Sequence, residues 1–109
     1  MSFSLDVVVD HPDGYSSTFE VVESHTYNLA PMWCRALRIK RTSDLKGRAC
    51  ADLDPQITLA LDDITRNADS YRDLEPVNGW GDFDGFWEIF TKFALVVRRH
   101  PTGRVEWRG

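Results

Sequence analysis

The sequence predicts an α+β fold, in which a three-stranded antiparallel sheet packs against about three helices. Two stretches near the N-terminus and one at the C-terminus alternate apolar and polar residues, which is typical of half-buried strands. Three stretches between them place apolar residues three and four positions apart, which is typical of amphipathic helices. The 109 residues, of which 42% are apolar, suit one α+β domain spanning residues 1–109.

The two N-terminal strands are predicted to form a hairpin. In the first strand, residues 3–9, every second residue is apolar and is expected to face the core. Residues 11–14 contain a proline and a glycine, which suit a turn because proline fixes φ and glycine accepts a positive φ. The second strand, residues 18–22, is expected to place Phe19 and Val21 on one face.

The first helix is predicted to begin at about Ala30. Either Thr26 or Asn28 can cap it, and Pro31 falls in its first turn, where a missing N–H costs no hydrogen bond. Residues 38–51 follow without a clean period and contain five basic residues. We therefore expect a basic, irregular excursion of the chain between the first and second helices.

The second helix is predicted to begin at Asp54 and Pro55, because aspartate caps a helix and proline is tolerated in its first turn. Apolar residues then recur at helical spacing, and the helix is expected to end at about residues 71–74. Proline and glycine in residues 76–81 predict a break before the next helix.

The third helical pattern runs from Phe86 to Val97. Residues 94–99 also fit a strand, so two structures remain open for that stretch. The final strand is expected to place Val105 and Trp107 inward and to pair with the hairpin, because an isolated strand cannot satisfy its own backbone.

The charges argue against one broad class of protein. Thirteen Lys and Arg against 17 Asp and Glu give a net charge of -4, which disfavours general nucleic-acid binding. The charges are also segregated, since residues 35–51 carry a net +5 and residues 52–91 a net -8. Such blocks either steer an oppositely charged partner or neutralise one another across the fold.

Neither a membrane segment nor a disulfide framework is predicted. No apolar run approaches the roughly 20 residues of a membrane helix, and no basic region followed by an apolar stretch opens the chain. Cys34 and Cys50 are too few for a disulfide framework and match no metal-binding spacing. We therefore expect a cytoplasmic protein with reduced cysteines and no membrane association.

A first candidate site lies at the predicted junction between the second strand and the first helix. An imidazole, a phenol, an amide and an indole occur there within nine residues, and two arginines follow that can meet an anion. The candidate ligand-binding residues are His25, Tyr27, Asn28, Trp33, Arg35 and Arg38. The alternative is that the amide caps the helix and the aromatic rings belong to the core.

A second candidate site is the predicted loop after the second helix. Trp80 lies between two glycines and is held on a tight loop, where it either closes the core or points outward as an interface anchor. The candidate partner-binding residues are Asp73, Glu75, Asn78, Trp80, Asp82 and Asp84.

Signals for catalysis are weak. Cys34 and His25 can serve as a nucleophile and a base, but they are nine residues apart across a strand-to-helix break, which does not predict contact. Asp10, His11 and Asp13 have metal-ligand side chains, yet they occur in a turn, where aspartate is common. We predict no catalytic residue, metal or cofactor, and we favour a non-enzymatic protein.

Two short strings carry a resemblance to known sequences. TYNLAPMW at Thr26 to Trp33 and PVNGWG at Pro76 to Gly81 resemble a group of small proteins from actinobacteria and their phages. The resemblance covers the chain from about His25 onward and implies a phage or mobile-element accessory protein, without implying an activity. Residues 38–51 would be an insertion relative to that group.

The expected function is therefore binding. We expect a non-enzymatic accessory protein that binds and modulates a host or partner protein through the loop from Asn78 to Asp84. The alternative is a module that binds a nucleotide or another anion between His25 and Arg38.

Overall fold

The computed structural model describes all residues, 1–109, and confirms the predicted α+β fold. Its three strands form one antiparallel sheet in the order β2-β1-β3. The strands are β1 (Ser2–Asp10), β2 (Ser16–Thr26) and β3 (Arg104–Arg108). The helices are α1 (Ala30–Leu37), α2 (Cys50–Arg66), α3 (Ala68–Arg72) and α4 (Phe83–Arg99), with 3-10 turns at Tyr27–Leu29 and Thr42–Leu45.

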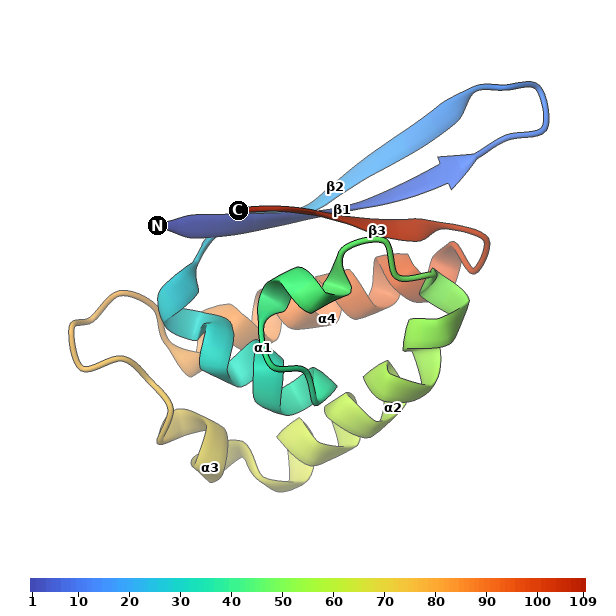
Figure 1. The fold of residues 1–109 in the computed structure, drawn as a ribbon. Helices are drawn as coiled ribbons and strands as arrows, with labels where there is room; N and C mark the ends of the chain where they lie inside the picture. The colour runs from blue at the N-terminus through green and yellow to red at the C-terminus, as the bar shows by residue number, and fades with distance from the viewer.

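The helices lie on one face of the sheet, and the tip of the β1–β2 hairpin extends beyond them (Figure 1). None of the helices is both long enough and apolar enough to cross a lipid bilayer. The two chain ends lie close together at the other end of the sheet from the hairpin tip (Figure 1).

The hairpin forms as predicted, but β2 departs from the expected alternation. Its pairing with β1 is irregular around Leu5, and there both Val21 and Val22 are buried. Such an irregularity shifts which side chains face the core. Phe19 pairs with buried Val7 and stacks on His100, the residue after α4, with 4.2 Å between ring centroids, so it faces the helices although it is 37% exposed.

The second helix begins earlier than predicted, at Cys50, and Pro55 lies inside it. The earlier start follows from packing, because Cys50 and Leu53 are buried and the backbone N–H of Cys50 donates to the carbonyl of Gly103 at 2.9 Å. The helix ends at Arg66, and the remainder of the predicted span forms the short α3.

Residues 38–51 are not an excursion from the domain. Thr42 and Leu45 are buried, so the segment contributes to the core. The backbone N–H of Gly47 donates to the carbonyl of Val105, and the N–H of Val105 donates to the carbonyl of Arg48, each at 2.8 Å. The segment therefore covers the outer edge of β3.

Residues 94–99 are helical, which decides between the two predicted alternatives. The helix α4 is continuous to Arg99 and begins at an aspartate cap, where the Asp82 carboxylate accepts a hydrogen bond from the N–H of Gly85 at 2.7 Å. In β3, Val105 is buried as predicted, whereas Trp107 is only half-buried.

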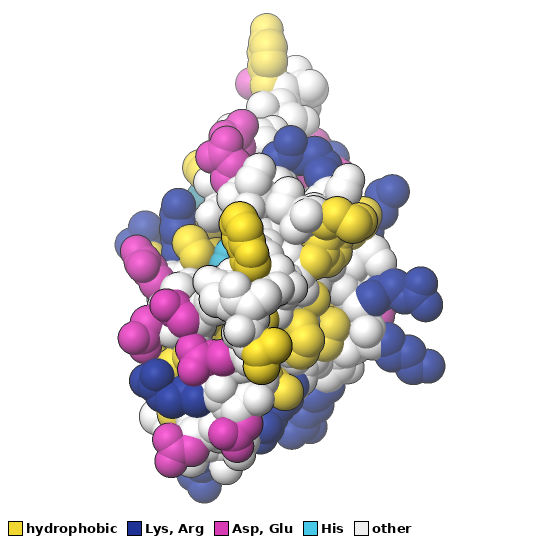
Figure 2. All heavy atoms as spheres, turned by 90° about the vertical axis from the view of Figure 1, so that its left-hand side faces the viewer, with side chains coloured by type: hydrophobic (Ala, Val, Ile, Leu, Met, Phe, Trp, Pro, Cys, Tyr) yellow, Lys and Arg dark blue, Asp and Glu magenta, His cyan; other side chains and the backbone are white.

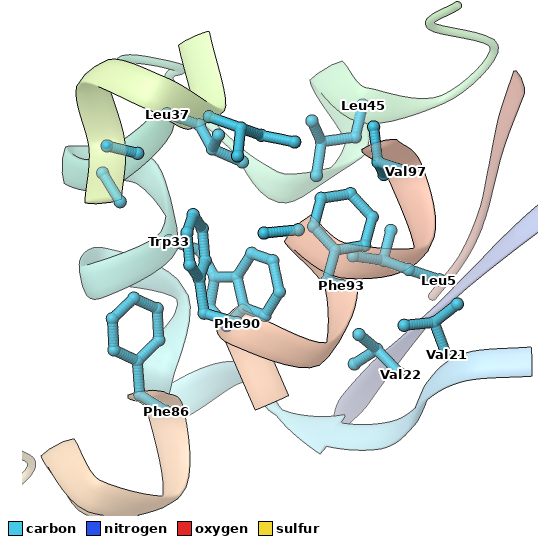
Figure 3. Packing of buried hydrophobic residues seen from close by; sticks show 14 of the residues in the cluster. Leu5, Val21, Val22, Trp33, Leu37, Leu45, Phe86, Phe90, Phe93 and Val97 are labelled. Atoms are coloured by element: carbon cyan, nitrogen blue, oxygen red, sulfur yellow. The ribbon is translucent and has the colours of Figure 1, made fainter. Parts of the chain in front are cut away.

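The core centres on Trp33 of α1, which has no exposed surface. Its ring lies 5.1 Å from that of Phe90 and 5.5 Å from that of Phe93 on α4, centroid to centroid. Figure 3 shows this indole between α1 and the aromatic side chains of α4, with Leu5 of the sheet on the far side of Phe93. Of the two places that the sequence left open for Trp33, a binding site and the core, the structure has the core.

A hydrogen-bonded cluster joins α1, α2 and α3. The Tyr71 hydroxyl donates to Asp63 Oδ2 at 2.5 Å, and Asn67 Nδ2 donates to Asp63 Oδ1 at 2.8 Å. The Arg35 guanidinium lies over the Tyr71 ring, 4.5 Å from its centroid. Burial and the bond to the carboxylate raise the pKa of Tyr71, and the hydrogen bond from Tyr71 lowers the pKa of Asp63.

Replacing Tyr71 with phenylalanine is expected to lower the free energy of unfolding by about 1–2 kcal/mol at pH 7, because a hydrogen bond to a charged group is lost. The folded pKa of Asp63 lies below its unfolded value, so this stabilisation is present above about pH 4 and is lost as the pH falls through the folded pKa. The raised pKa of Tyr71 gives a contribution that is present below about pH 10 and is lost as the pH rises further.

Urea titrations at pH 7 and pH 3 measure the difference between Tyr71→Phe and the wild type. Tyr15→Phe is the matched control, because Tyr15 is 75% exposed, and it should change the free energy of unfolding by less than about 0.5 kcal/mol. Equal destabilisation by Tyr71→Phe at both pH values would contradict a role for the charged carboxylate.

Candidate functional site

The fold brings part of each candidate cluster of the sequence together at one end of the molecule. A hollow of about 530 Å³ lies between them. It is lined by Met1, Ser2, Ser24, Thr26, Asn28, Asn78 and Trp80. The loop of residues 73–82 packs tightly here, since a Cβ on Gly81 would lie 2.9 Å from Leu29 Cγ.

Hydrogen bonds brace this loop at both ends. The N–H of Phe83 donates to Glu75 Oε2 at 2.8 Å, which ties the start of the loop to the start of α4. The N–H of Trp80 donates to Asn78 Oδ1 at 2.9 Å. Gly79 and Gly81 have φ values of 76° and 104°, which side chains other than glycine rarely adopt. The loop therefore presents Trp80 from a defined backbone.

Trp80 points outward, which decides the question that the sequence left open. Its side chain is 68% exposed, and Met1 and Val77 are fully exposed. Figure 2 looks onto this end of the molecule, where hydrophobic side chains gather near the middle, acidic side chains lie mainly to the left, and Lys and Arg side chains follow the right edge.

Three of the four predicted rim carboxylates have structural partners. Glu75 and Asp82 accept backbone hydrogen bonds, and Asp84 pairs with Arg72 Nη2 at 3.4 Å. Asp73 is exposed and makes neither a side-chain hydrogen bond nor an ion pair. The rim of the loop therefore remains acidic, but Asp73 is the one carboxylate of the four that does not help to hold the loop in place.

The predicted ligand set does not form one pocket. Trp33 is in the core, and Arg35 lies against Tyr71, with its Nε 3.6 Å from Asp63 Oδ2. His25 packs between aromatic rings, and burial lowers its pKa, which favours the neutral imidazole. The other three residues lie apart from one another. Tyr27 and Asn28 line different hollows. Arg38 is exposed at the end of α1, where its backbone is left-handed.

Cys34 is not arranged as an activated nucleophile. Burial and the nearby charge of Asp44 raise the pKa of its thiol, which disfavours the thiolate. His25 Nε2 is buried without a hydrogen-bond partner, so it makes no hydrogen bond to the thiol. At the hairpin turn, Asp10 accepts a hydrogen bond from Ser16 and His11 bonds Ser17, so both are engaged in the turn itself.

Sequence reasoning missed a second hollow, of about 410 Å³, beside α1. It is lined by Tyr27, Ala30, Pro31, Cys34, Lys40, Arg41, Thr42, Ser43 and Trp107. The sequence did not predict this hollow for two reasons. Residues 38–51 were expected to leave the domain, and Trp107 was expected to face the core. The pairing of β3 with β1 brings Trp107 and the basic segment together.

The charge blocks of the sequence neutralise one another only in part. Ion pairs join Arg104 to Asp10, Arg108 to Asp6 and Arg98 to Asp54, so the C-terminal bases meet acids from earlier in the chain. The five bases of residues 38–51 take part in no ion pair. Two of these bases, Lys40 and Arg41, line the second hollow, and the Asp44 carboxylate lies nearby.

Comparison of the chain with known protein families, with curated proteins and with solved structures gives no match.

Proposed function

We propose that this protein binds another protein through the loop of residues 73–82, with Trp80 as the anchor. The observation that carries the proposal is the outward Trp80 side chain, 68% exposed on a loop that hydrogen bonds brace at both ends. Tryptophan is enriched among residues that dominate binding energy, because it buries a large area at little cost in conformational entropy. Exposed Met1 and Val77 add apolar surface to this anchor.

The charge around the anchor indicates the chemistry of the partner. Residues 68–88 carry six acids and one base, Arg72. The proposed partner therefore offers an apolar pocket that accepts an indole and a rim of Lys and Arg side chains. Complementary rim charges mainly raise the association rate, and salt screens them.

The biological setting of this proposal comes from the resemblance to small actinobacterial and phage proteins. On that basis we assign the protein an accessory role in a phage or mobile element, acting in the host cytoplasm. Its partner would be a host protein whose activity it modulates by occupying a surface. No catalytic step is part of this proposal.

Replacing Trp80 with alanine is expected to weaken partner binding by about 2 kcal/mol or more, roughly thirtyfold, because the anchor area is lost. The free energy of unfolding should change by less than about 0.5 kcal/mol, since an exposed residue is removed. Tagged protein is used to capture its partner from an actinobacterial lysate, and the affinity of the purified pair is then measured by calorimetry.

Leu59→Ala is the matched control, because Leu59 is 51% exposed and lies on α2. It should retain full affinity. Asp73→Asn should slow association with little change in dissociation, because its carboxylate has no structural partner. A captured protein that binds Trp80→Ala as tightly as the wild type would refute this interface.

A further inference from the structure

We propose that the hollow beside α1 binds a small molecule that contains a flat aromatic ring and a phosphate group, such as a nucleoside monophosphate. This site is separate from the Trp80 loop and does not depend on the function proposed for that loop. It places an aromatic wall next to two cations and two hydroxyl groups. These are the groups that bind a flat ring and a phosphate.

The aromatic wall is built from Tyr27 and Trp107. Trp107 Nε1 donates to Thr42 Oγ1 at 3.1 Å, and Thr42 is buried, so the indole is held in one orientation. The Tyr27 ring is supported by Phe3, with 5.5 Å between ring centroids. Pro31 completes the apolar surface. A heteroaromatic ring gains stacking energy on side chains that are already fixed.

The cations of the hollow are Lys40 and Arg41. Neither is in an ion pair, although six other arginines of the chain are. The nearby carboxylate of Asp44 accepts the backbone N–H groups of Lys40 and Arg41 at 3.1 Å and 3.2 Å. It therefore fixes the backbone under the two cations while their side chains stay available. Guanidinium and ammonium groups form charge-assisted hydrogen bonds with phosphate.

The size of the hollow agrees with such a ligand. A volume of about 410 Å³ lies within the range of small-molecule sites, which is roughly 300–1,000 Å³. The hydroxyl of Ser43 lies in the same wall and can donate to a phosphate oxygen. The half-buried thiol of Cys34 lines the hollow too, which supplies a built-in reporter.

The test is calorimetric titration of the wild type with adenosine and guanosine monophosphates. Inorganic phosphate, ribose 5-phosphate and adenosine are titrated alongside them. We expect binding of at least one monophosphate, with ribose 5-phosphate at least about tenfold weaker, because it lacks the ring. Adenosine should also bind at least about tenfold more weakly, because it lacks the phosphate.

The double variant Lys40→Gln with Arg41→Gln is expected to bind the monophosphate at least about tenfold more weakly and adenosine unchanged. Its matched control is Lys46→Gln with Arg99→Gln, which also removes two exposed cations that have no ion pair. The control should bind as the wild type does. Circular dichroism of both variants checks that the fold is retained.

Alkylation of Cys34, run at an alkaline pH because its pKa is raised, reports occupancy at this hollow directly. The bound monophosphate should slow the reaction of Cys34 with a maleimide, whereas Cys50 is buried and should stay unreactive with or without the ligand. Loss of this protection in the Lys40 and Arg41 double variant supports the assignment.

Three results would overturn the proposal. The first is no binding and no Cys34 protection at millimolar monophosphate. The second is equal loss of affinity in the test and control double variants, which would indicate a general charge effect. The third is a short single-stranded oligonucleotide that binds far more tightly than every monophosphate with a steep salt dependence, which would assign the site to nucleic acid instead.

Discussion

Replacing Trp33 with alanine is expected to lower the free energy of unfolding by about 3–5 kcal/mol, the range found when a large aromatic side chain is removed from a core. Trp33 has no exposed surface, and its indole contacts rings from both the sheet and α4. Small domains have a total stability of only about 5–15 kcal/mol, so this single change removes a large share of it. Urea denaturation followed by circular dichroism measures the loss.

Two variants make this result specific. Trp33→Phe is expected to cost less, roughly 1–2 kcal/mol, because a ring still fills most of the space and the buried indole N–H, which has no partner, is removed. Trp80→Ala deletes the same side chain from an exposed position and should leave stability nearly unchanged. A cost for Trp33→Ala no greater than that for Trp80→Ala would contradict the assignment of Trp33 to the centre of the core.

Replacing Gly81 with alanine is expected to lower the free energy of unfolding by about 2–4 kcal/mol. Two costs combine: a positive φ of 104° is strained for any residue with a Cβ, and the added Cβ meets Leu29 at 2.9 Å. Leu29 is buried in the core, so it has little freedom to move away. The same urea titrations measure this change.

Gly79→Ala separates the two costs. Gly79 also has a positive φ, of 76°, but a Cβ there would meet nothing within 4 Å. It should therefore cost only about 1 kcal/mol, from backbone strain alone. Equal destabilisation by the two substitutions would show that the contact between Gly81 and Leu29 contributes nothing to holding the Trp80 loop against the core.

Hydrophobic periodicity was sufficient to predict the architecture. The α4 pattern from Phe86 to Val97 and the final alternation around Val105 lie in the predicted elements. The start of α2 was not predictable in the same way. Asp54 and Pro55 form a strong local start signal, but the burial of Cys50 and Leu53 against distant elements extends the helix past it.

The candidate site was predicted in part. The sequence indicated that Trp80 sits on a tight loop between glycines, and the structure has it there. It did not indicate which way the side chain points, because that depends on how the loop packs against distant residues such as Leu29. The same limit applies to Trp33, for which the sequence left both a binding site and the core open, and to Trp107, which was expected to face the core and is half-buried beside it.

The sequence by itself determined the class of fold, the hairpin and the helical faces, because these follow from the local spacing of apolar residues. Only the tertiary structure decided which aromatic residues are buried and which basic residues stay unpaired. Both depend on contacts between segments far apart in the chain, such as Trp107 with Thr42 and Arg104 with Asp10. Local sequence patterns do not indicate which distant segments meet. The pairing of β3 with β1 brings these residues together.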